Sequence, residues 1–515
     1  MTRYCTWLGS AILLLAWAGC GPVSRGGPLV VQPGVAQLFV DDAIIESDRG
    51  MIRTLHQPVK DHGGERPIID APPKTSLLAY GTIVFDTKLD RYVMFVQEFA
   101  PETRQMYQVL SRDGINWEPT DGRLLDPVSL DRNLGDVPRD KAINAAGSRE
   151  IDLFSCYYDR TDATYPYKGW AWFANWGNDL EGIFYIRSRD GKAWERGRQI
   201  VNGFAGPGDA SCRTIRQDGK LVRGPGDVTL FYHDPVSNRF LGIFKFFNHD
   251  GVGAGNNLRS RAYLWLDRLD EPVDTNRIMR IALLPPNAYR SGDTPFDEYY
   301  ATTAWRYESL WLGTLKIFHP HGDYPHSAAG CAFFKLVVSR DGLNWNKVPY
   351  LNDGGVPEVF LPNGPEGGHG GRNDGGYMSD FSQGPLRIGD ELIFYYSASS
   401  WGKNLPREQR LMGGGIFRGR LRLDGFVSVD KGNVTTRPLM CSGAKELMVN
   451  AVGPVKVEVL DAAGEALGSA TLEGDSIRHA ARFDGKSLAE TAGGGNPRLR
   501  FTVEPGGKLY SFTLN

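Results

Sequence analysis

Ser111-Arg-Asp-Gly-Ile-Asn-Trp117 recurs twice in this chain, as Ser188-Arg-Asp-Gly-Lys-Ala-Trp194 and as Ser339-Arg-Asp-Gly-Leu-Asn-Trp345. The first two copies begin 77 residues apart and the third begins 151 residues after the second, so a degenerate copy is expected near Tyr263 to Asp267. A repeat of about 75 residues, with aromatic and β-branched runs separated by Asn, Asp and Gly, suits a four-stranded propeller blade. Within each copy we expect Asp-Gly to form a hairpin turn and the Trp to pack between blades.

The composition of the 515-residue chain is that of an all-β protein. Its 63 glycines, 31 prolines and 11% aromatic residues favour many short strands joined by tight turns. Five repeat units fit between about residue 75 and residue 432, which predicts a five-bladed β-propeller over residues 37–433. The strand Gln37 to Glu46 is expected to close the ring or to pack beneath it. From Val434 to Asn515 a Gly- and Ala-rich alternation predicts a small C-terminal β-sandwich, residues 434–515.

The amino-terminal residues 1–20 have the features of a signal peptide. Arg3 precedes an apolar stretch, Leu8 to Gly19, that is too short to span a bilayer. Its end, Ala16-Trp-Ala-Gly-Cys20, is similar to a bacterial lipoprotein box, in which Cys20 is lipidated and becomes the first mature residue. We therefore expect residues 21–36 to be a linker. The protein is expected to be exported, as a cell-envelope lipoprotein in the periplasm or at the cell surface, or as a secreted protein after ordinary cleavage.

Charge and cysteine content narrow the set of partners. A formal net charge of -2, with both signs interspersed, gives no electrostatic reason to expect nucleic acid or an anionic membrane surface. Membrane contact is expected only through the N-terminal lipid anchor, and the simplest ligand is neutral. The remaining cysteines allow one or two disulfides, and neither a Cys-x-x-Cys nor a Cys/His spacing indicates zinc. These cysteines are Cys156, Cys212, Cys331 and Cys441.

Three carboxylates begin successive apolar runs. Asp152 begins Asp-Leu-Phe-Ser-Cys-Tyr-Tyr, Asp227 begins Asp-Val-Thr-Leu-Phe-Tyr-His 75 residues later, and Glu308 follows 81 residues further on. The innermost strand of each blade lines the central channel, so carboxylates at the strand starts can meet at its mouth. Burying an unpaired charge is costly, and glycoside hydrolysis needs one protonated and one ionised carboxyl together. We therefore predict that Asp152, Asp227 and Glu308 are catalytic.

Each of these carboxylates also has a structural interpretation, a strand-end salt bridge with an arginine such as Arg149, Arg223 or Arg306. Aromatic residues near the strand ends, Tyr299 and Tyr300 among them, could stack against sugar rings, although most Trp in a propeller packs between blades. The predicted substrate-binding residues lie near strand ends or in expected mouth loops. They are Trp172, Trp176, Arg306, His321 and Asp380.

Several further segments carry a family resemblance. They are Leu38-Phe-Val-Asp-Asp42, Leu55-His-Gln-Pro58, Gly226-Asp227 before Leu-Phe-Tyr, Tyr307-Glu-Ser-Leu310 with Gly313, and Leu423-Asp-Gly-Phe-Val-Ser428. Through them the chain resembles, over about residues 37 to 515, the five-bladed β-propeller glycoside hydrolase superfamily of arabinanases, xylosidases, invertases and levansucrases. It is most similar to secreted bacterial proteins related to the invertase family, glycosyl hydrolase family 32.

The resemblance implies three catalytic roles on successive blades: an Asp base or nucleophile, a second Asp that stabilises the transition state or tunes a pKa, and a Glu general acid. Carried over in order, these roles fall on Asp152, Asp227 and Glu308. Two departures stand out, because the invertase Asn-Asp-Pro-Asn segment is missing and the first blade offers Lys74 where a carboxylate is expected.

The leading interpretation is an exported glycoside hydrolase that cleaves an oligo- or polysaccharide by carboxylate acid/base catalysis. No organic cofactor is expected, and a structural Ca²⁺ in the channel is compatible with this interpretation. The alternative is a non-catalytic carbohydrate-binding surface lipoprotein with a degenerate site. A sialidase-like enzyme, suggested by the Asp-Gly hairpins, needs an arginine triad, a tyrosine nucleophile and six blades, and a purely structural scaffold has no adhesive repeats to support it.

Overall fold

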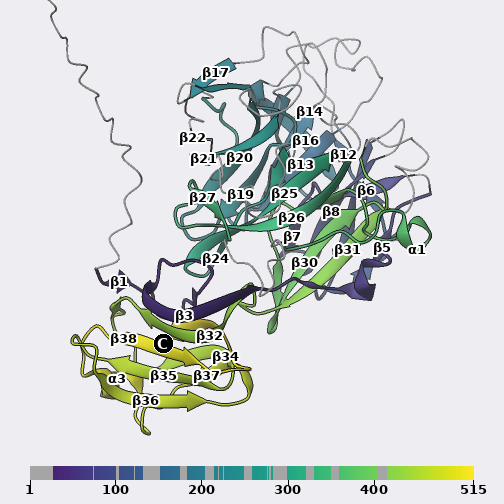
Figure 1. Ribbon diagram of the computed structural model, residues 1–515. Helices are drawn as coiled ribbons and strands as arrows, with labels where there is room; N and C mark the ends of the chain where they lie inside the picture. Colours follow the sequence, from purple (N-terminus) through teal and green to yellow (C-terminus); the bar gives the residue numbers. More distant parts are fainter. Residues whose placement is uncertain are drawn as a thin grey trace, which may run out of the picture.

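The chain folds almost entirely into β-strands, which form five blades and one further sheet (Figure 1). The blades make a five-bladed β-propeller, as predicted, and the further sheet lies beside it. The computed structural model describes residues 27–73, 75–99, 104–120, 122–130, 151–173, 182–202, 214–217, 220–223, 225–248, 258–274, 277, 280–281, 298–320, 330–348, 359–403 and 414–515.

Each blade is a sheet whose main strands run in chain order from the channel outward. Blade 1 holds β6 (Ser76–Leu78), β7 (Ile83–Asp86), β8 (Arg91–Phe99), β9 (Arg104–Ser111), β10 (Trp117–Glu118) and β11 (Asp126–Pro127). Blade 2 holds β13 (Ile151–Tyr158), β14 (Tyr167–Phe173), β15 (Gly182–Ser188) and β16 (Ala193–Asn202), with β12 (Ser129–Leu130) pairing in parallel outside β16.

The other blades follow the same plan. Blade 3 holds β19 (Leu230–Asp234), β20 (Arg239–Asn248), β21 (Leu258–Leu266) and β22 (Arg280–Ile281), with the hairpin β17 (Thr214–Gln217) and β18 (Lys220–Arg223) pairing to the end of β20. Blade 4 holds β23 (Glu298–Thr302), β24 (Trp305–Tyr307), β25 (Leu310–Pro320), β26 (Gly330–Ser339) and β27 (Trp345–Lys347). Blade 5 holds β28 (Met378–Asp380), β29 (Leu386–Ile388), β30 (Glu391–Ala398) and β31 (Gly415–Arg422).

Two short strands near the amino terminus close the ring. β4 (Val59–Lys60) and β5 (Ile69–Asp70) both pair with β31 and form the outer edge of blade 5. The earlier strand that was expected to do this instead joins the further sheet, through β2 (Gln37–Leu38). Closure therefore pairs strands more than 340 residues apart in the chain, which removes an exposed edge from the last blade.

The repeated heptapeptide forms the turn that was predicted. In the third copy, Asp341 accepts from the backbone amides of Leu343 and Asn344 at 2.8 and 2.7 Å. The Ser339 hydroxyl accepts from Gly342, whose φ of 76° suits glycine. These contacts confirm a structural role for the motif, which links the third strand of blades 1, 2 and 4 to the strand outside it.

The hydrophobic core is divided between neighbouring blades because side chains alternate along each strand. On β8, Val93 and Phe95 pack toward blade 2, whereas Met94 and Val96 pack toward blade 5. The predicted ligand-stacking residue Trp172 is 2% exposed and lies in the core shared by blades 2 and 3. This corrects its assignment, because a buried ring packed on both faces offers no surface to a sugar.

The C-terminal region forms a nine-stranded sheet that takes up both ends of the chain. Its long strand β32 (Val427–Thr436) runs through the predicted boundary at residue 433 and pairs with β3 (Ile45–Leu55). Its other strands enclose one core with β2 and β3, and the short helix α3 (Leu488–Ala492) begins at a Ser487 capping box. They are β34 (Leu447–Val452), β35 (Val455–Leu460), β36 (Ala466–Leu472), β37 (Asp475–Ala480), β38 (Arg498–Val503) and β39 (Lys508–Leu514).

Three short elements complete the description: β1 (Leu29–Val30), which pairs in parallel with β33 (Leu439–Met440), the 3-10 turn η1 (Asp61–Gly64) and α1 (Gly368–Gly371). In the part of the chain that the structure describes, no helix has the length and apolar character to cross a membrane. Within the same part, Cys156, Cys331 and Cys441 are free thiols.

Candidate active site

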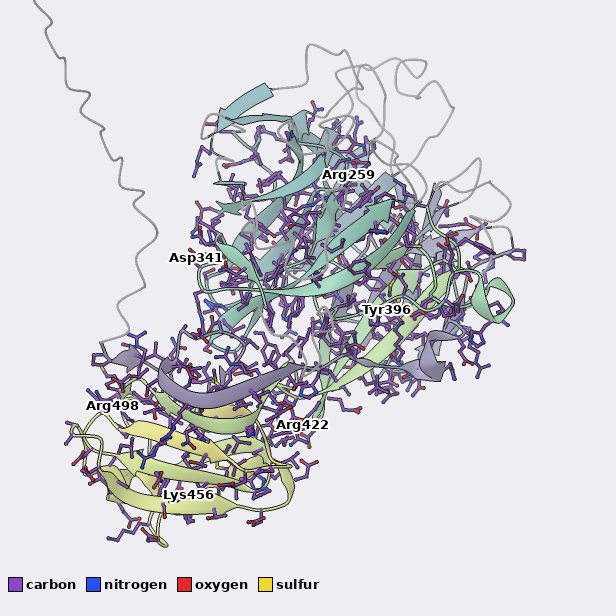
Figure 2. The ribbon with its side chains drawn as sticks, in the orientation of Figure 1. Arg259, Asp341, Tyr396, Arg422, Lys456 and Arg498 are labelled. Carbon is purple, nitrogen blue, oxygen red and sulfur yellow. The ribbon has the colours of Figure 1, made fainter. Side chains whose placement is uncertain are left out.

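The inner strands of the blades begin at one end of the propeller and turn outward at the other. Tyr307 stands at a turn, and its hydroxyl donates to Asp424 at 2.7 Å, a carboxylate that also accepts from Ser511 of the nine-stranded sheet at 2.6 Å. The turns of the inner strands therefore face that sheet. The strand starts lie at the remote end, here called the channel mouth, and Figure 2 places Arg259 far from Arg498 in the sheet.

Asp227 supplies a solvent-accessible carboxylate at the channel mouth. Its side chain is 36% exposed and forms an ion pair with Lys245 of β20, whose side chain is 7% exposed. Although burial opposes ionisation, the Lys245, Arg259 and Lys403 cations hold the pKa of Asp227 well below its usual range. Gly226 permits this pairing, because a Cβ at position 226 would lie 3.1 Å from the Lys245 side chain.

A second ion pair joins Glu298, the first residue of β23, to Arg259 of β21. Both side chains are almost fully buried, at 2% and 5% exposure. The guanidinium carbon of Arg259 lies 4.4 Å from the ring centroid of Tyr300, and its charge also acts on Asp227. Glu298 is therefore the carboxylate of blade 4 that stands beside Asp227, and it was not among the residues predicted from the sequence.

A buried lysine draws together side chains from three blades. Lys316 of β25 donates to the hydroxyls of Tyr80 and Tyr377, each at 3.1 Å, and to Ser379 at 2.7 Å. Tyr80 lies between the two halves of the inner strand of blade 1, and Tyr377 and Ser379 open the inner strand of blade 5. The ammonium group of Lys316 is therefore held near the axis on which the blades converge.

Tyr300 has an electrostatic setting that differs from that of its tyrosine neighbours. Burial opposes its ionisation, but the Lys403, Arg259 and Lys245 cations outweigh that effect and lower the pKa of Tyr300 to about 8. Burial raises the pKa of both Tyr80 and Tyr377 above the usual tyrosine value. Lys403 donates to the Tyr300 hydroxyl at 2.5 Å.

These groups form one continuous polar site, here called the axial cluster. Its members are Tyr80, Asp227, Lys245, Arg259, Glu298, Tyr300, Lys316, Tyr377, Ser379 and Lys403. Only Asp227 and Tyr300 had been singled out from the sequence, because the cations come from second and third strands and from the segment after β30. The run of buried Lys and Arg within apolar strands, Lys245, Arg259 and Lys316, was the available signal.

Glu308 lies at the end of blade 4 opposite the axial cluster. It occupies the two-residue turn between β24 and β25 with a φ of 50°, accepts from the Ala36 amide at 2.9 Å and lies 3.4 Å from Arg387. Burial raises its pKa. The catalytic prediction for Glu308 is wrong, because the apolar run that follows it is the second strand of the blade and not the first.

Arg306 also lies at the turn end, where it is 3.3 Å from Asp234 in an ion pair. The structural interpretation of this arginine is therefore correct, and its assignment to substrate binding is not supported. Asp152 and Asp380 lie in β13 and β28, opposite Trp172 and Tyr396, and their side chains are outside the described part. Trp176, His321 and Cys20 are outside the described residues altogether.

The described part of the chain holds no group of three His, Cys, Asp or Glu side chains arranged to bind a metal ion. In the axial cluster, the Lys316 ammonium already directs a positive charge at hydroxyls from blades 1 and 5. A calcium ion placed beside it would meet like charge, so these residues do not fit the channel Ca²⁺ that was considered from the sequence.

The axial cluster offers an ionised carboxylate, several hydrogen-bond donors and a tyrosine that can exchange a proton near neutral pH. Preorganised cations of this kind stabilise negative charge that develops on an oxygen. The site therefore suits a reaction in which a bond to oxygen breaks and a proton must reach that oxygen.

No protein-family model matches the chain, and no curated protein matches it in sequence. Solved structures that it is similar to include a thermostable family-43 glycoside hydrolase, at 10% identity and a TM-score of 0.40, over 71% of this chain and 95% of that one. Another is the catalytic domain of a Coprinopsis cinerea GH62 α-L-arabinofuranosidase, at 10% identity and 0.40, over 71% and 97%. A third is a Phanerochaete chrysosporium exo-β-1,3-galactanase, at 9% identity and 0.33, over 87% and 99%.

Proposed function

We propose that this protein is an exported glycoside hydrolase that cleaves an oligo- or polysaccharide at the channel mouth. The observation that carries the proposal is the Asp227 carboxylate, which is partly exposed, kept ionised by Lys245 and adjacent to the buried Glu298–Arg259 pair. An ionised carboxylate can activate water or stabilise the positive charge that develops on the sugar ring. Asp227 keeps the role predicted for it, and Glu298 replaces Glu308 as its neighbour on blade 4.

The test is a screen of the purified protein against aryl glycosides and polysaccharides, scored for sugar release and for binding. Asp227→Asn should lower kcat/KM by about 10²- to 10⁴-fold, as expected for loss of an acid/base group. The matched control is Asp267→Asn, because Asp267 lies in the same blade, is 78% exposed and pairs with Arg239 at the surface. Equal loss in both variants, or no loss in either, would count against a catalytic Asp227.

A non-catalytic carbohydrate-binding protein is the second candidate. It is favoured by one observation, that each described carboxylate of the axial cluster is ion-paired with a cation, so that neither is placed as the protonated acid of a carboxylate pair. Saccharide binding without release by the wild-type protein, across the whole panel, would establish this function.

Export and lipidation are also part of the proposal, and they rest on the sequence of residues 1–20. Mass spectrometry of the protein expressed with its own leader should show an acylated Cys20 at the mature terminus. Cys20→Ser should abolish the acylation, whereas Cys441→Ser, at a thiol of the C-terminal region, should leave it unchanged. An unmodified mature chain that begins elsewhere would instead indicate plain secretion.

A further inference from the structure

We propose that Tyr300 is the proton-transfer residue of the axial cluster and supplies a proton to the leaving-group oxygen of the saccharide. This inference rests on the proposed function and adds the group that the carboxylates do not provide. Asp227 is held ionised and Glu298 is bound to Arg259, so neither is ready to give a proton to a glycosidic oxygen.

The geometry around Tyr300 concentrates positive charge on its ring and hydroxyl. Lys403 donates to the hydroxyl at 2.5 Å, and its ammonium lies 4.8 Å from the ring centroid. The Lys316 ammonium lies 5.0 Å and the Arg259 guanidinium carbon 4.4 Å from the same centroid. Cations so placed favour the phenolate over the phenol, because they attract the negative charge that ionisation creates.

The charged and titratable groups around Tyr300 come from all the elements packed against it. Lys245 of β20 adds a further cation, whereas the Asp227 carboxylate opposes ionisation. Tyr377 packs edge-on at 5.7 Å between ring centroids, and Tyr80 is hydrogen-bonded to Tyr377 at 2.7 Å. The balance lowers the pKa of Tyr300 to about 8, so the hydroxyl is still protonated at neutral pH but releases its proton more readily than an ordinary tyrosine.

The proposed step conserves atoms and charge. The Tyr300 proton passes to the glycosidic oxygen as the bond between that oxygen and the anomeric carbon breaks, with its electron pair remaining on the oxygen. Water adds to the anomeric carbon and passes a proton to the Asp227 carboxylate. Solvent exchange then returns that proton to the Tyr300 phenolate, which restores both groups.

Access to Tyr300 is from the side of Lys403 and Asp227. Tyr300 itself is 4% exposed, whereas Lys403 is half-buried and Asp227 is 36% exposed. A saccharide oxygen that approaches Asp227 therefore reaches the Tyr300 hydroxyl by taking the place of the Lys403 ammonium as its hydrogen-bond partner.

A spectroscopic titration tests the ionisation directly. The ultraviolet absorption of phenolate should show one tyrosine of the wild-type protein titrating near pH 8, a step absent from Tyr300→Phe. Lys403→Met should move the step upward, because the nearest cation is gone. Tyr107→Phe is the control, since burial and Glu98 raise the pKa of Tyr107 to about 12 and its loss should leave the step in place. A step that persists in Tyr300→Phe overturns the proposal.

Kinetics on a cleaved substrate then test the role of Tyr300. Tyr300→Phe should retain saccharide binding and the wild-type melting temperature but lower kcat by about 10²- to 10⁴-fold. The basic limb of the wild-type pH profile should move upward in Lys403→Met together with the spectroscopic step. Full activity in Tyr300→Phe, with Asp227→Asn inactive, would overturn the role of Tyr300 and leave the proposed function standing. No release by the wild-type protein would overturn both.

Discussion

Glu298 and Glu308 stand at opposite ends of the inner strand of blade 4. Glu298 opens β23 and pairs with Arg259, whereas Glu308 follows β24 in the turn that accepts from Ala36. Ten residues of extended chain separate them, a distance of about 30 Å at the usual rise of a strand. Only Glu298 can therefore act together with Asp227.

Removing each of these two carboxylates should affect stability differently. Glu298→Gln breaks an ion pair in which both side chains are almost fully buried, so the free energy of unfolding should fall by about 3–5 kcal/mol. Glu308→Gln is the matched control, because its partner Arg387 is 49% exposed, and it should cost at most about 1 kcal/mol at pH 7. Urea unfolding of both variants measures the difference. Equal losses would contradict the burial argument.

Glu308 should make stability depend on pH in a defined direction. Burial raises its pKa above the usual 4.5, so the folded state binds the proton more tightly than the unfolded state does. Its contribution is therefore fully present below pH 4.5 and is lost as the pH rises through the raised folded pKa. The stability of the wild-type protein relative to Glu308→Gln should fall over this range in urea titrations. A difference that rises with pH would be inconsistent with this sign.

Gly226→Ala should disturb the Asp227 site through Lys245. The new methyl group would lie 3.1 Å from the Lys245 side chain, which is itself 7% exposed and has little room to move. We expect a loss of about 1–3 kcal/mol in unfolding free energy, together with lower saccharide release. Gly495→Ala is the control, because its methyl group would meet only the Ala492 carbonyl at 3.6 Å. Thermal melts and release assays on both variants check this.

Asp341→Ala should weaken blade 4 without touching the channel mouth. Asp341 accepts from two backbone amides in its turn and lies away from Arg259 in Figure 2. Two buried amides that lose their acceptor should cost about 1–3 kcal/mol each before relaxation. Asp267→Ala, at an exposed surface pair, should cost less than about 1 kcal/mol. Unchanged kcat/KM in the folded Asp341→Ala protein would show that the motif is structural, and a large loss would reopen a catalytic role.

Much of the fold could be predicted from local pattern. The Ser-x-Asp-Gly-x-x-Trp spacing led to five blades, because the turn it encodes is local and recurs once per unit, as Asp341 and Gly342 show. The pairing of β3 with β32 and of β4 and β5 with β31 could not be predicted in the same way. Such pairings depend on which strand edges are left open after the blades assemble, and no short-range pattern records that.

The sequence by itself determined the repeat, the all-β composition and the carboxylate at Asp227, since these depend on residue type and spacing. Only the tertiary structure decided that Glu298 and not Glu308 is its neighbour. It alone also showed that Lys245, Arg259, Lys316 and Lys403 surround Tyr300. The physical reason is that a pKa and an ion pair depend on distance in space, and these groups come from three blades that meet only when the ring is closed.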